Sequence, residues 1–572
     1  PVDLGTRCTV FMNSKVKQAQ KEGAKVADIA AGLAYSVVKN ALFKVIKLRD
    51  AEKLGKKIVV QGGTFYNDAV LKAFEIVSGR EVVRPEISGI MGAFGAALIA
   101  RDRAGDATTT LSYEKIKAFT YKTSTTHCNG CENKCRLTVN HFGDGKRYIS
   151  GNRCEKALKG AAAKDEAPNL FEYKLGRIFS YEPLPKNKAP MGEIGLPRAL
   201  NMYENYPFWA VFFKELGFKV VLSPYTTRKM YEAGMDTIPS ESQCYPAKIV
   251  HGHIEWLIKS GVKTIFYPCV FYERDEGRKT QNIYNCPIVI SYPENIKNNV
   301  DALTDKNVKY INPFISFENE EILSNRLCEI VKENWNISGG EVRAACHKAW
   351  KELLRCKEDI LNKGRETLRW MEKKGKAGVL LIGRPYHLDP EINHGIAKMI
   401  QGYGLAVFTE DSVASLAEDG VKLRSTNQWV YHSRLYAAAQ YAATRDDLEI
   451  VQLNSFGCGV DAVTVDQVSE LCEQSGKMYT LLKIDEVNNL GAARIRVRSM
   501  IAALNERKKD AAKKLIKPKD YVRVEYTAGM QEDKYTILCP GMITPHFDFM
   551  ESALRSEGFN FVMMWNEGQE VY

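Results

Sequence analysis

Four cysteines in the first third of the chain have the clearest chemical meaning. Cys128, Cys131, Cys135 and Cys154 follow the spacing Cys-x2-Cys-x3-Cys-x18-Cys. Gaps of two and three residues let thiolates from one turn converge on a single centre, and the glycine-containing loop 142–145 can fold the fourth one back. This spacing suits a four-iron cluster or a structural zinc ion. A disulfide is disfavoured, because the opening residues show no export signal and a reducing compartment favours thiolate ligands.

Three more cysteines follow segments that resemble buried strands or tight turns. Cys269 ends the apolar run 264–269, Cys458 lies between two glycines, and Cys244 lies in Gln-Cys-Tyr-Pro-Ala-Lys. Because ligands gather at the carboxyl ends of parallel strands, these thiols could meet in a cleft between two lobes. Glycines beside Cys458 would let backbone amides donate to cluster sulfides. The cysteines in helix-like segments are expected to be packing residues: Cys328, Cys346, Cys356 and Cys472.

The elements that would position these cysteines repeat one pattern. Residues 193–221, 379–408 and 536–562 each read as a strand, a turn with Gly or Pro, a helix, a glycine and a second strand. This order opens a parallel βαβ lobe. The predicted fold class is therefore α/β, with two Rossmann/flavodoxin-like parallel-sheet lobes after the small four-cysteine cluster module.

The first hundred residues combine a long amphipathic helix with a candidate nucleotide-binding turn. Apolar residues recur at helical spacing between Ile29 and Val45. A strand over residues 57–61 then runs into Gly62 and Gly63 and a further helix. A Gly-Gly turn lets a ligand approach the backbone, and a helix N-terminus favours phosphate or polar groups. On spacing alone, this is a weak indication of nucleotide binding.

Three motifs in this first part resemble the activator ATPases of 2-hydroxyacyl-CoA dehydratases and benzoyl-CoA-type reductases. They are Gly-Thr-Arg-Cys-Thr-Val-Phe-Met-Asn in residues 5–15, Gly-Gly-Thr-Phe-Tyr-Asn in residues 59–67, and Met-Gly-Ala-Phe-Gly in residues 90–97. The resemblance implies the C-terminal part of an ATPase domain with the actin/Hsp70-like fold.

The same resemblance implies roles for individual residues. Cys8 would be one of the cysteines that bridge a cubane across a homodimer, although a buried packing role stays open. Gly62, Gly63 and Asn67 would contact the adenosine of ATP. The family's two phosphate loops and its other cluster cysteine would precede Pro1. We therefore expect an internal segment of a longer polypeptide, which should not hydrolyse ATP unaided.

The later cysteine motifs resemble the cluster-bearing subunits of 2-hydroxyacyl-CoA dehydratases and the related double-cubane cluster reductases. The resemblance lies in Cys-Tyr-Pro-Ala-Lys, a strand-end cysteine 25 residues later, and Phe-Gly-Cys-Gly. It implies that Cys244, Cys269 and Cys458 bind a cluster. Cys286, in Asn-Cys-Pro, ranks below them as a fourth or double-cubane ligand.

Two longer motifs suggest how the parts are joined. Residues 195–209 and 383–395 are similar to large activase-related proteins, which fuse activator ATPase modules to a dehydratase-like part. The expected order is the end of an ATPase domain, the four-cysteine iron–sulfur module, two α/β lobes and the start of a further α/β unit. The bounds that we expect for these domains are, in order, residues 1–105, 106–170, 171–345, 346–515 and 516–572.

Residues suited to acid–base chemistry are few. A dehydratase or reductase needs a proton donor near its substrate, and histidine titrates near neutral pH. His251 and His253 lie at helical spacing after a cysteine motif, and His387 and His394 flank an Asp-Pro pair. Surface and capping roles are the commoner reading for each, and Glu391 with His394 reads as a helix-surface pair. The catalytic residues therefore stay unassigned.

Length and composition exclude several classes of protein. The chain has 572 residues, 14 cysteines and a net charge of +11, with a mean hydropathy of -0.29. Its apolar runs are strand-sized, so no membrane association is expected. Much of the positive charge lies in residues 494–514 without interleaved aromatics, which argues against nucleic acid.

Together these features predict a cytoplasmic iron–sulfur protein. It would carry four-iron cubanes, one of which could be a double cubane, and the complete protein would use ATP. A low-potential donor such as ferredoxin or flavodoxin would supply electrons for the reduction or radical dehydration of a CoA thioester or small molecule. The alternative is a zinc-stapled scaffold that docks partners without catalysis.

Overall fold

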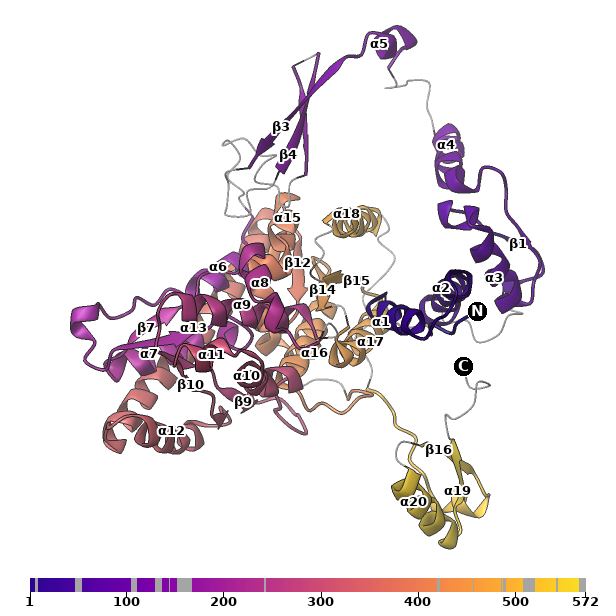
Figure 1. Cartoon of the computed structure of the whole chain (residues 1–572). Helices are drawn as coiled ribbons and strands as arrows, with labels where there is room; N and C mark the ends of the chain where they lie inside the picture. Colours follow the sequence, from indigo (N-terminus) through magenta and orange to yellow (C-terminus); the bar gives the residue numbers. More distant parts are fainter. Residues whose placement is uncertain are drawn as a thin grey trace. The chain divides into compact units, whose positions relative to one another are not determined.

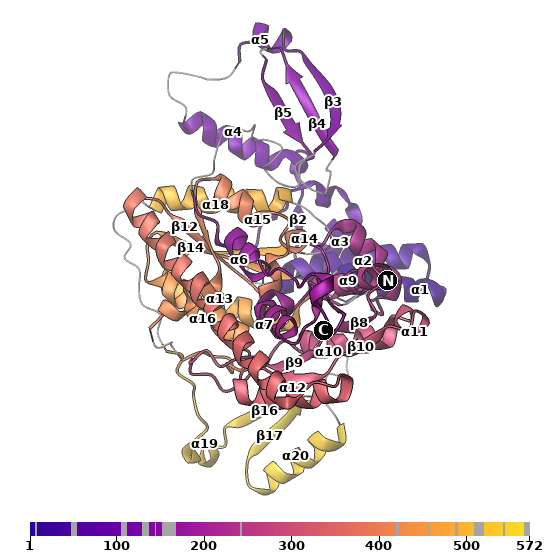
Figure 2. The ribbon, with the colours of Figure 1, turned by 90° about the vertical axis from the view of Figure 1, so that its left-hand side faces the viewer.

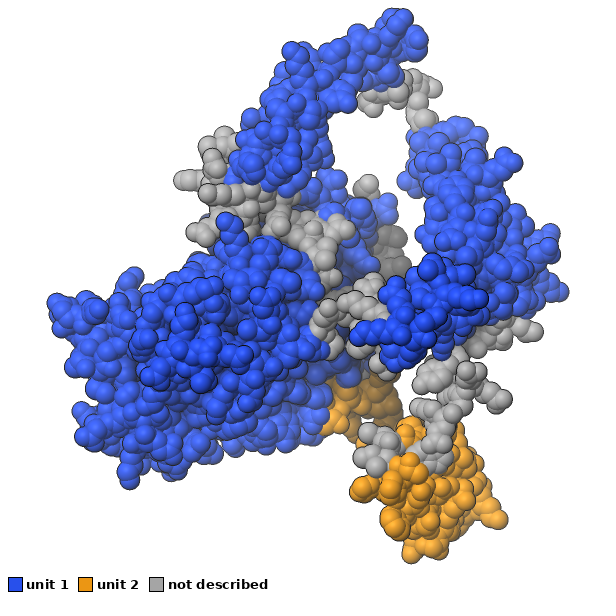
Figure 3. Space-filling model, viewed as in Figure 1, with its two compact units in different colours: residues 1–420, 427–517 blue, residues 421–426, 518–572 orange. Residues whose placement is uncertain are grey.

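Parallel strands alternate with helices along most of the chain, which confirms the α/β class (Figure 1). The computed structural model describes residues 1–5, 9–46, 54–103, 111–128, 136–143, 145–151, 167–240, 243–418, 422–455, 457–484, 486, 490–507, 520–541 and 544–564. Figure 3 colours its two compact units, which are residues 1–420 with 427–517 and residues 421–426 with 518–572.

Residues 1–103 form a helical part around a short parallel strand pair. The strands β1 and β2 place Ile58 opposite Val82, and α2 packs on α3. The elements are α1 (Thr9–Lys21), α2 (Val26–Lys39), η1 (Asn40–Val45), β1 (Ile58–Val59), η3 (Gly63–Tyr66), α3 (Asp68–Ser78), β2 (Val82–Val83), η4 (Ser88–Ile90) and α4 (Met91–Arg103).

One helical stretch of this part, Val26–Phe43, is long and apolar enough to cross a membrane by length and composition alone. One-third of it, 33%, is buried in the structure. Its residues Val38 and Leu42 lie in an apolar cluster with Phe74 of α3. A helix that packs on a protein core passes the same test of length and composition.

Residues 113–151 form an antiparallel sheet in which the Cys128 motif joins two strands. Because β5 runs antiparallel to β4, it ends where β4 begins. Gly151 follows β5 with φ +83, and a Cβ there would lie 2.5 Å from the Arg136 carbonyl oxygen. The chain towards Cys154 thus leaves the sheet at the edge that carries Cys128. The elements are α5 (Tyr113–Lys117), β3 (Tyr121–His127), β4 (Arg136–Phe142) and β5 (Arg147–Ser150).

The first lobe is a parallel sheet in the order β10–β8–β6–β7, continued by the parallel pair β9 and β11. The strand order reverses at β6, so the carboxyl ends of β6 and β8 flank a topological switch point. Its strands are β6 (Glu193–Leu196), β7 (Lys219–Leu222), β8 (Thr264–Phe266), β9 (Cys269–Tyr272), β10 (Lys309–Ile311) and β11 (Phe314–Ser316). Its helices are α6 (Leu170–Ile178), α7 (Met202–Glu215), α8 (Arg228–Ala233), α9 (Tyr245–Lys259), α10 (Pro287–Asn299), α11 (Ala302–Asp305) and α12 (Glu320–Asn334).

The second lobe is a parallel sheet in the order β13–β12–β14–β15. Its central strands are buried on both faces, which explains their continuous apolar runs. Its strands are β12 (Gly378–Ile382), β13 (Ala406–Phe408), β14 (Leu448–Ser455) and β15 (Tyr479–Ile484). Its helices are α14 (Pro390–Asn393), α15 (Ile396–Gly402), α16 (Val430–Ala443), α17 (Gly459–Gln474) and α18 (Leu490–Arg507).

The long helix α13 (Gly339–Lys374) joins the two lobes (Figure 2). A capping box between Ser338 and Glu341 starts it, and left-handed Gly375 ends it. It packs on α6, α7 and α12 of the first lobe and on η9 (Glu410–Ser412) of the second. The lobes share one apolar core, because α13 and the residues after β12 both contribute to it.

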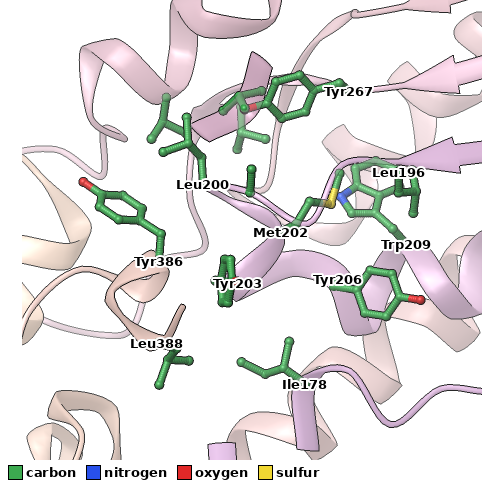
Figure 4. Packing of buried hydrophobic residues seen from close by; sticks show 14 of the residues in the cluster. Ile178, Leu196, Leu200, Met202, Tyr203, Tyr206, Trp209, Tyr267, Tyr386 and Leu388 are labelled. Atoms are coloured by element: carbon green, nitrogen blue, oxygen red, sulfur yellow. The ribbon is translucent and has the colours of Figure 1, made fainter. Parts of the chain in front are cut away.

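Figure 4 shows the centre of this shared core, where Tyr386 and Leu388 from the second lobe lie beside Leu200 and Tyr203 of the first. The hydroxyl of Tyr203 donates to Asp389 Oδ2 at 2.5 Å. The join between the lobes is therefore part of the interior rather than a solvent-filled gap.

Buried ion pairs also cross this join. Arg434 of α16 donates to Glu204 of α7 at 2.7 Å, and Lys357 of α13 pairs with the same carboxylate. Lys174 of α6 pairs with Asp411 at 2.6 Å. Removing one partner of a buried pair costs about 3–5 kcal/mol, because the other charge is left uncompensated. These pairs therefore fix one arrangement of the two lobes.

The second unit holds one strand–helix–strand repeat, in which β16 and β17 pair in parallel. This is the repeat predicted from residues 536–562. Its elements are α19 (Ala528–Glu532), β16 (Thr536–Pro540), α20 (Thr544–Ser556) and β17 (Asn560–Met564).

The close approach of α13 to η9 generates a testable prediction. A Cβ at Gly364 would lie 2.1 Å from the Ser412 carbonyl oxygen, so Gly364→Ala should destabilise the joined lobes by about 1–3 kcal/mol. Gly340→Ala in the same helix meets nothing within 4 Å and should be neutral or slightly stabilising. Thermal unfolding of both variants measures the difference, and equal midpoints would contradict this packing.

Candidate functional site

Three of the predicted cysteines each precede a helix. Cys244 is the N-cap of α9, Cys286 is the N-cap of α10, and Cys458 is the N-cap of α17. Prolines in the first turn, Pro246 and Pro287, start α9 and α10, because their fixed φ suits that position. A helix N-terminus carries partial positive charge and unpaired N–H groups. A helix N-terminus lowers the cost of placing negative charge at such a position.

The three thiols share one neighbourhood. Burial raises the pKa of Cys244 to about 12, and the nearby Cys286 and Cys458 add to this rise. Burial likewise raises the pKa of Cys458 to about 11, and Cys286 is again among the contributing charges. Burial raises the pKa of the Tyr386 phenol too, and the same three cysteines add to it. The structure thus brings together residues from both lobes that are far apart in the sequence.

Cys269 does not lie with these three thiols. It begins β9, is fully buried and donates weakly to the Asn312 carbonyl oxygen at 3.8 Å. Burial raises its pKa to about 12, and the acting charges are those of Glu294 and Lys297. Cys286, expected as a further ligand, shares charged neighbours with Cys244 and Cys458, whereas Cys269 has others, so the place of Cys269 in the grouping stays a prediction. The signal was available, since Cys-Pro and Cys-x-Pro mark two helix N-termini alike.

A buried cation lies beside Cys458. The guanidinium of Arg384 pairs with Asp461, and its Nη1 lies 3.1 Å from His432 Nδ1. Burial alone would lower the pKa of Arg384, but the charges of Asp461, Tyr386 and the neighbouring cysteines together raise it, so the group stays charged. The backbone N–H of Asp461 donates to Cys458 Sγ at 3.4 Å. Both the charge and the hydrogen bond stabilise a thiolate at Cys458.

The two histidines of α9 are buried between hydroxyl groups. His251 Nδ1 lies 2.7 Å from Thr237 Oγ1. His253 lies 2.8 Å from Ser223 Oγ and 2.9 Å from Thr226 Oγ1. Burial lowers the pKa of His251 to about 4 and that of His253 to about 3. Both are therefore neutral near pH 7 and suit structural hydrogen bonding better than proton delivery.

The histidines after β12 are also structural. His387 Nδ1 accepts from the Arg384 backbone N–H at 2.9 Å, and burial lowers the pKa of His387 to about 3. His394 adopts φ +52 and ends α14. Glu391 accepts from the Tyr245 hydroxyl at 3.3 Å, so this carboxylate also contributes to the contact between lobes.

The glycine turn of the first part has the open backbone that nucleotide binding requires. Gly62 has φ +104, a conformation that favours glycine, and a Cβ at Gly62 or Gly63 would meet nothing within 4 Å. Asn67 Oδ1 accepts from the Ala69 backbone N–H at 3.0 Å and so caps α3. Cys8 lies outside the described residues. The roles of the turn and of Asn67 in adenosine binding stay predictions.

The four-cysteine motif is described only in part. Cys128 follows β3 directly and is half-buried. Cys131, Cys135 and Cys154 lie outside the described residues. Among the residues that are described, no group of three Cys, His, Asp or Glu side chains is arranged to hold a single metal ion. The metal sites predicted from the sequence therefore stay predictions.

Two segments of the chain match models of known families. Residues 2–100 match the BadF/BadG/BcrA/BcrD ATPase family, and residues 193–413 match the CoA enzyme activase uncharacterised domain. These matches confirm the resemblance to activases for both segments.

Three curated relatives match about one-fifth of the chain. It is 35% identical over 103 residues to the 2-hydroxyisocaproyl-CoA dehydratase activator of Clostridioides difficile, covering 18% of this chain and 37% of that protein. It is 34% identical over 103 residues to the (R)-2-hydroxyglutaryl-CoA dehydratase activating ATPase of Acidaminococcus fermentans, covering 18% of this chain and 38% of that protein. An uncharacterised protein of Methanocaldococcus jannaschii is 29% identical over 117 residues, which cover 20% of this chain and 26% of that protein. The chain thus spans little more than a third of either activator.

The buried histidines predict a loss of stability in acid. Between pH 6.5 and about 3 the unfolded chain binds protons at His253 and His387 that the folded chain does not. The free energy of unfolding should therefore fall as pH falls, by about 1.4 kcal/mol per pH unit for each histidine. Urea unfolding between pH 5 and 7 measures this slope. His253→Asn should make it shallower, and a slope identical to that of the wild type would contradict the assignment.

Proposed function

We propose that this chain belongs to an ATP-driven activase system for 2-hydroxyacyl-CoA dehydratase chemistry. In this proposal Cys244, Cys286 and Cys458 hold an iron–sulfur cluster where the two lobes join. The observation that carries the proposal is that three helices, from separate parts of the sequence, begin at three neighbouring thiols. The family matches of both segments and the names of the relatives support the link to CoA enzyme activation.

The donor set fits a cluster better than a single ion. Thiolates that bind different irons of one cubane lie farther apart than thiolates on one metal ion. The proposed donors are three thiols that share one electrostatic environment, and thiolates are the usual ligands of a four-iron cluster. When bound, such a cluster would supply one-electron transfer at low potential, with three cysteines leaving one iron open to another ligand.

The residues around the thiols prepare the site for negative charge. The N-termini of α9, α10 and α17 place partial positive charge at Cys244, Cys286 and Cys458. Arg384 adds a full positive charge, while the Asp461 backbone N–H donates to one thiol. Burial raises the pKa of Cys244 and Cys458, so metal binding at these two thiols must release protons.

ATP use is proposed for the complete ATPase domain. The open turn at Gly62 and Gly63 is where the family resemblance places adenosine, with Asn67 beside it. ATP-driven conformational change in that domain would raise the energy of an electron before its delivery to the cysteine site. A homodimer bridged through Cys8, a ferredoxin or flavodoxin donor and a dehydratase partner complete the proposed system.

The four-cysteine module is proposed as a second centre. The antiparallel sheet places Cys128 and Gly151 at the same end, which supports convergence of the motif. An iron–sulfur cluster there would relay electrons, whereas zinc would only staple the fold.

Metal analysis tests the cysteine site directly. Anaerobically reconstituted protein should bind iron and acid-labile sulfide, and Cys244→Ser, Cys286→Ser and Cys458→Ser should each remove the same cluster signal in electron paramagnetic resonance. Cys269→Ser should retain that signal, because its thiol lies apart from the other three. Loss with Cys269→Ser and retention with Cys286→Ser would instead support the grouping expected from strand ends.

A separate substitution tests the second centre. Cys128→Ser should remove about one cubane's worth of iron and leave the signal of the lobe site intact, since the two motifs are separate in the sequence. Stoichiometric zinc without sulfide would identify the module as a structural staple. Zinc in place of iron at both sites would overturn the electron-transfer proposal and favour a docking scaffold.

A further inference from the structure

A buried carboxylate near Cys286 is bound by amides rather than by a cation of its own. Glu273 follows β9 and is 4% exposed. Its Oε1 accepts from Asn201 Nδ2 at 2.5 Å, from Asn285 Nδ2 at 2.9 Å and from Asn205 Nδ2 at 3.2 Å. Three side-chain amides from two separate segments therefore converge on one carboxylate.

The neighbouring cations are engaged by other acids. Arg434 pairs with Glu204 and Glu276, and Lys357 pairs with Glu204. Burial, with the Glu204 charge, accordingly raises the pKa of Glu273 to about 7. Amide donors can hold a buried carboxylate in a fixed orientation, because each N–H bond has a preferred direction.

Asn285 connects this carboxylate to the cysteine site. While its Nδ2 donates to Glu273 at 2.9 Å and to Asn201 Oδ1 at 3.0 Å, its Oδ1 accepts from the Cys286 backbone N–H at 2.8 Å. The side chain is 1% exposed and has no freedom to turn without breaking these bonds. The backbone N–H of Cys286 is thus fixed by a chain of hydrogen bonds that begins at Glu273.

The backbone around Asn201 supports the same arrangement. Leu200 adopts φ +43, a left-handed conformation that is strained for a residue other than glycine. This turn directs Asn201, the residue before α7, towards Glu273 and Asn285. Strain at a buried position persists only where other contacts offset it, and this network supplies them.

We propose that Glu273 is a positioning residue, which acts through Asn285 to fix the backbone of Cys286 and orient its thiol towards the other two cysteines. The proposal rests on the cysteine site described above. A carboxylate suits this role because both of its oxygens accept hydrogen bonds. A glutamine would instead place an NH2 group against the amide donors of Asn201, Asn205 or Asn285. The orientation of one cluster ligand would then depend on a residue that never contacts the cluster.

The reactivity of Cys286 in the metal-free full chain tests this without a cluster. Iodoacetamide labelling, quantified by peptide mass spectrometry, gives separate rates for Cys244, Cys286 and Cys458. Glu273→Gln should change the Cys286 rate by about fivefold, as expected for one hydrogen bond, and leave the other two unchanged. Glu276→Gln breaks a nearby buried ion pair with Arg434 without contacting Asn285, so it controls for general loosening of the join and should change the Cys286 rate less than Glu273→Gln does, relative to Cys244 and Cys458.

The pH profile separates positioning from a general structural effect. The groups facing Glu273 are Glu204 of α7, Lys357 of α13, and Tyr431 and Arg434 of α16. Protonation of Glu273 below about pH 7 replaces one acceptor by a donor. The ratio of Cys286 rates between wild type and Glu273→Gln should therefore change around that pH, and a ratio constant from about pH 6 to about pH 8.5 would overturn the proposal.

Two further measurements complete the test. Asn285→Ala should alter the Cys286 rate in the same direction, and circular dichroism identifies any variant that fails to fold. If Glu273→Gln does not fold, an unchanged Cys286 rate in folded Asn285→Ala overturns the proposal, and a changed rate upholds it. In reconstituted protein, Glu273→Gln should release iron to a chelator about tenfold faster than Glu276→Gln. Failure of the wild type to bind iron would overturn the proposed function but not the labelling result.

Discussion

Three helices that begin at neighbouring cysteines favour negative charge between their N-termini. Cys244, Cys286 and Cys458 lie at those N-termini, and each is more stable as a thiolate beside partial positive charge than away from it. Burial opposes this at Cys244 and Cys458, where it raises the pKa of the metal-free thiols. The helix N-termini therefore favour negative charge at this site while burial disfavours it. An anionic, thiolate-bound cluster would resolve this conflict. Arg384 strengthens the same preference from the second lobe.

The join between the lobes keeps the three cysteines near one another. The ion pair of Arg434 with Glu204 and the contacts of α13 hold together segments that supply the three cysteines. The strand-like segment before Cys286 is also hydrogen-bonded to the second lobe, since the Tyr284 N–H donates to the Gln428 carbonyl oxygen at 3.0 Å. The ligands of the proposed cluster thus depend on tertiary contacts, and no short motif contains them.

The sequence was informative wherever the signal was local. The strand over residues 379–382 and the helix after it were readable because apolar runs, Gly turns and helical spacing act over a few residues. The sequence could not show whether Cys269 or Cys286 lies nearer to Cys244 and Cys458, because both cysteines follow strand-like segments and their surroundings differ only in the folded chain. Glu273 and Asn201 gave no signal at all, since their hydrogen bond joins residues 72 positions apart.

The backbone bonds between residues 281–284 and 427–430 also constrain the order in which the protein can be assembled. Cys286 reaches its place only after this segment has paired with the chain that leads into α16 of the other lobe. Cys244 and Cys458, by contrast, are set by helices within single lobes. A maturation factor would therefore meet an incomplete pair of thiols in any chain whose lobes had not yet docked. Insertion of the proposed cluster would therefore require that docking had finished, which would make it a checkpoint in the maturation of the protein.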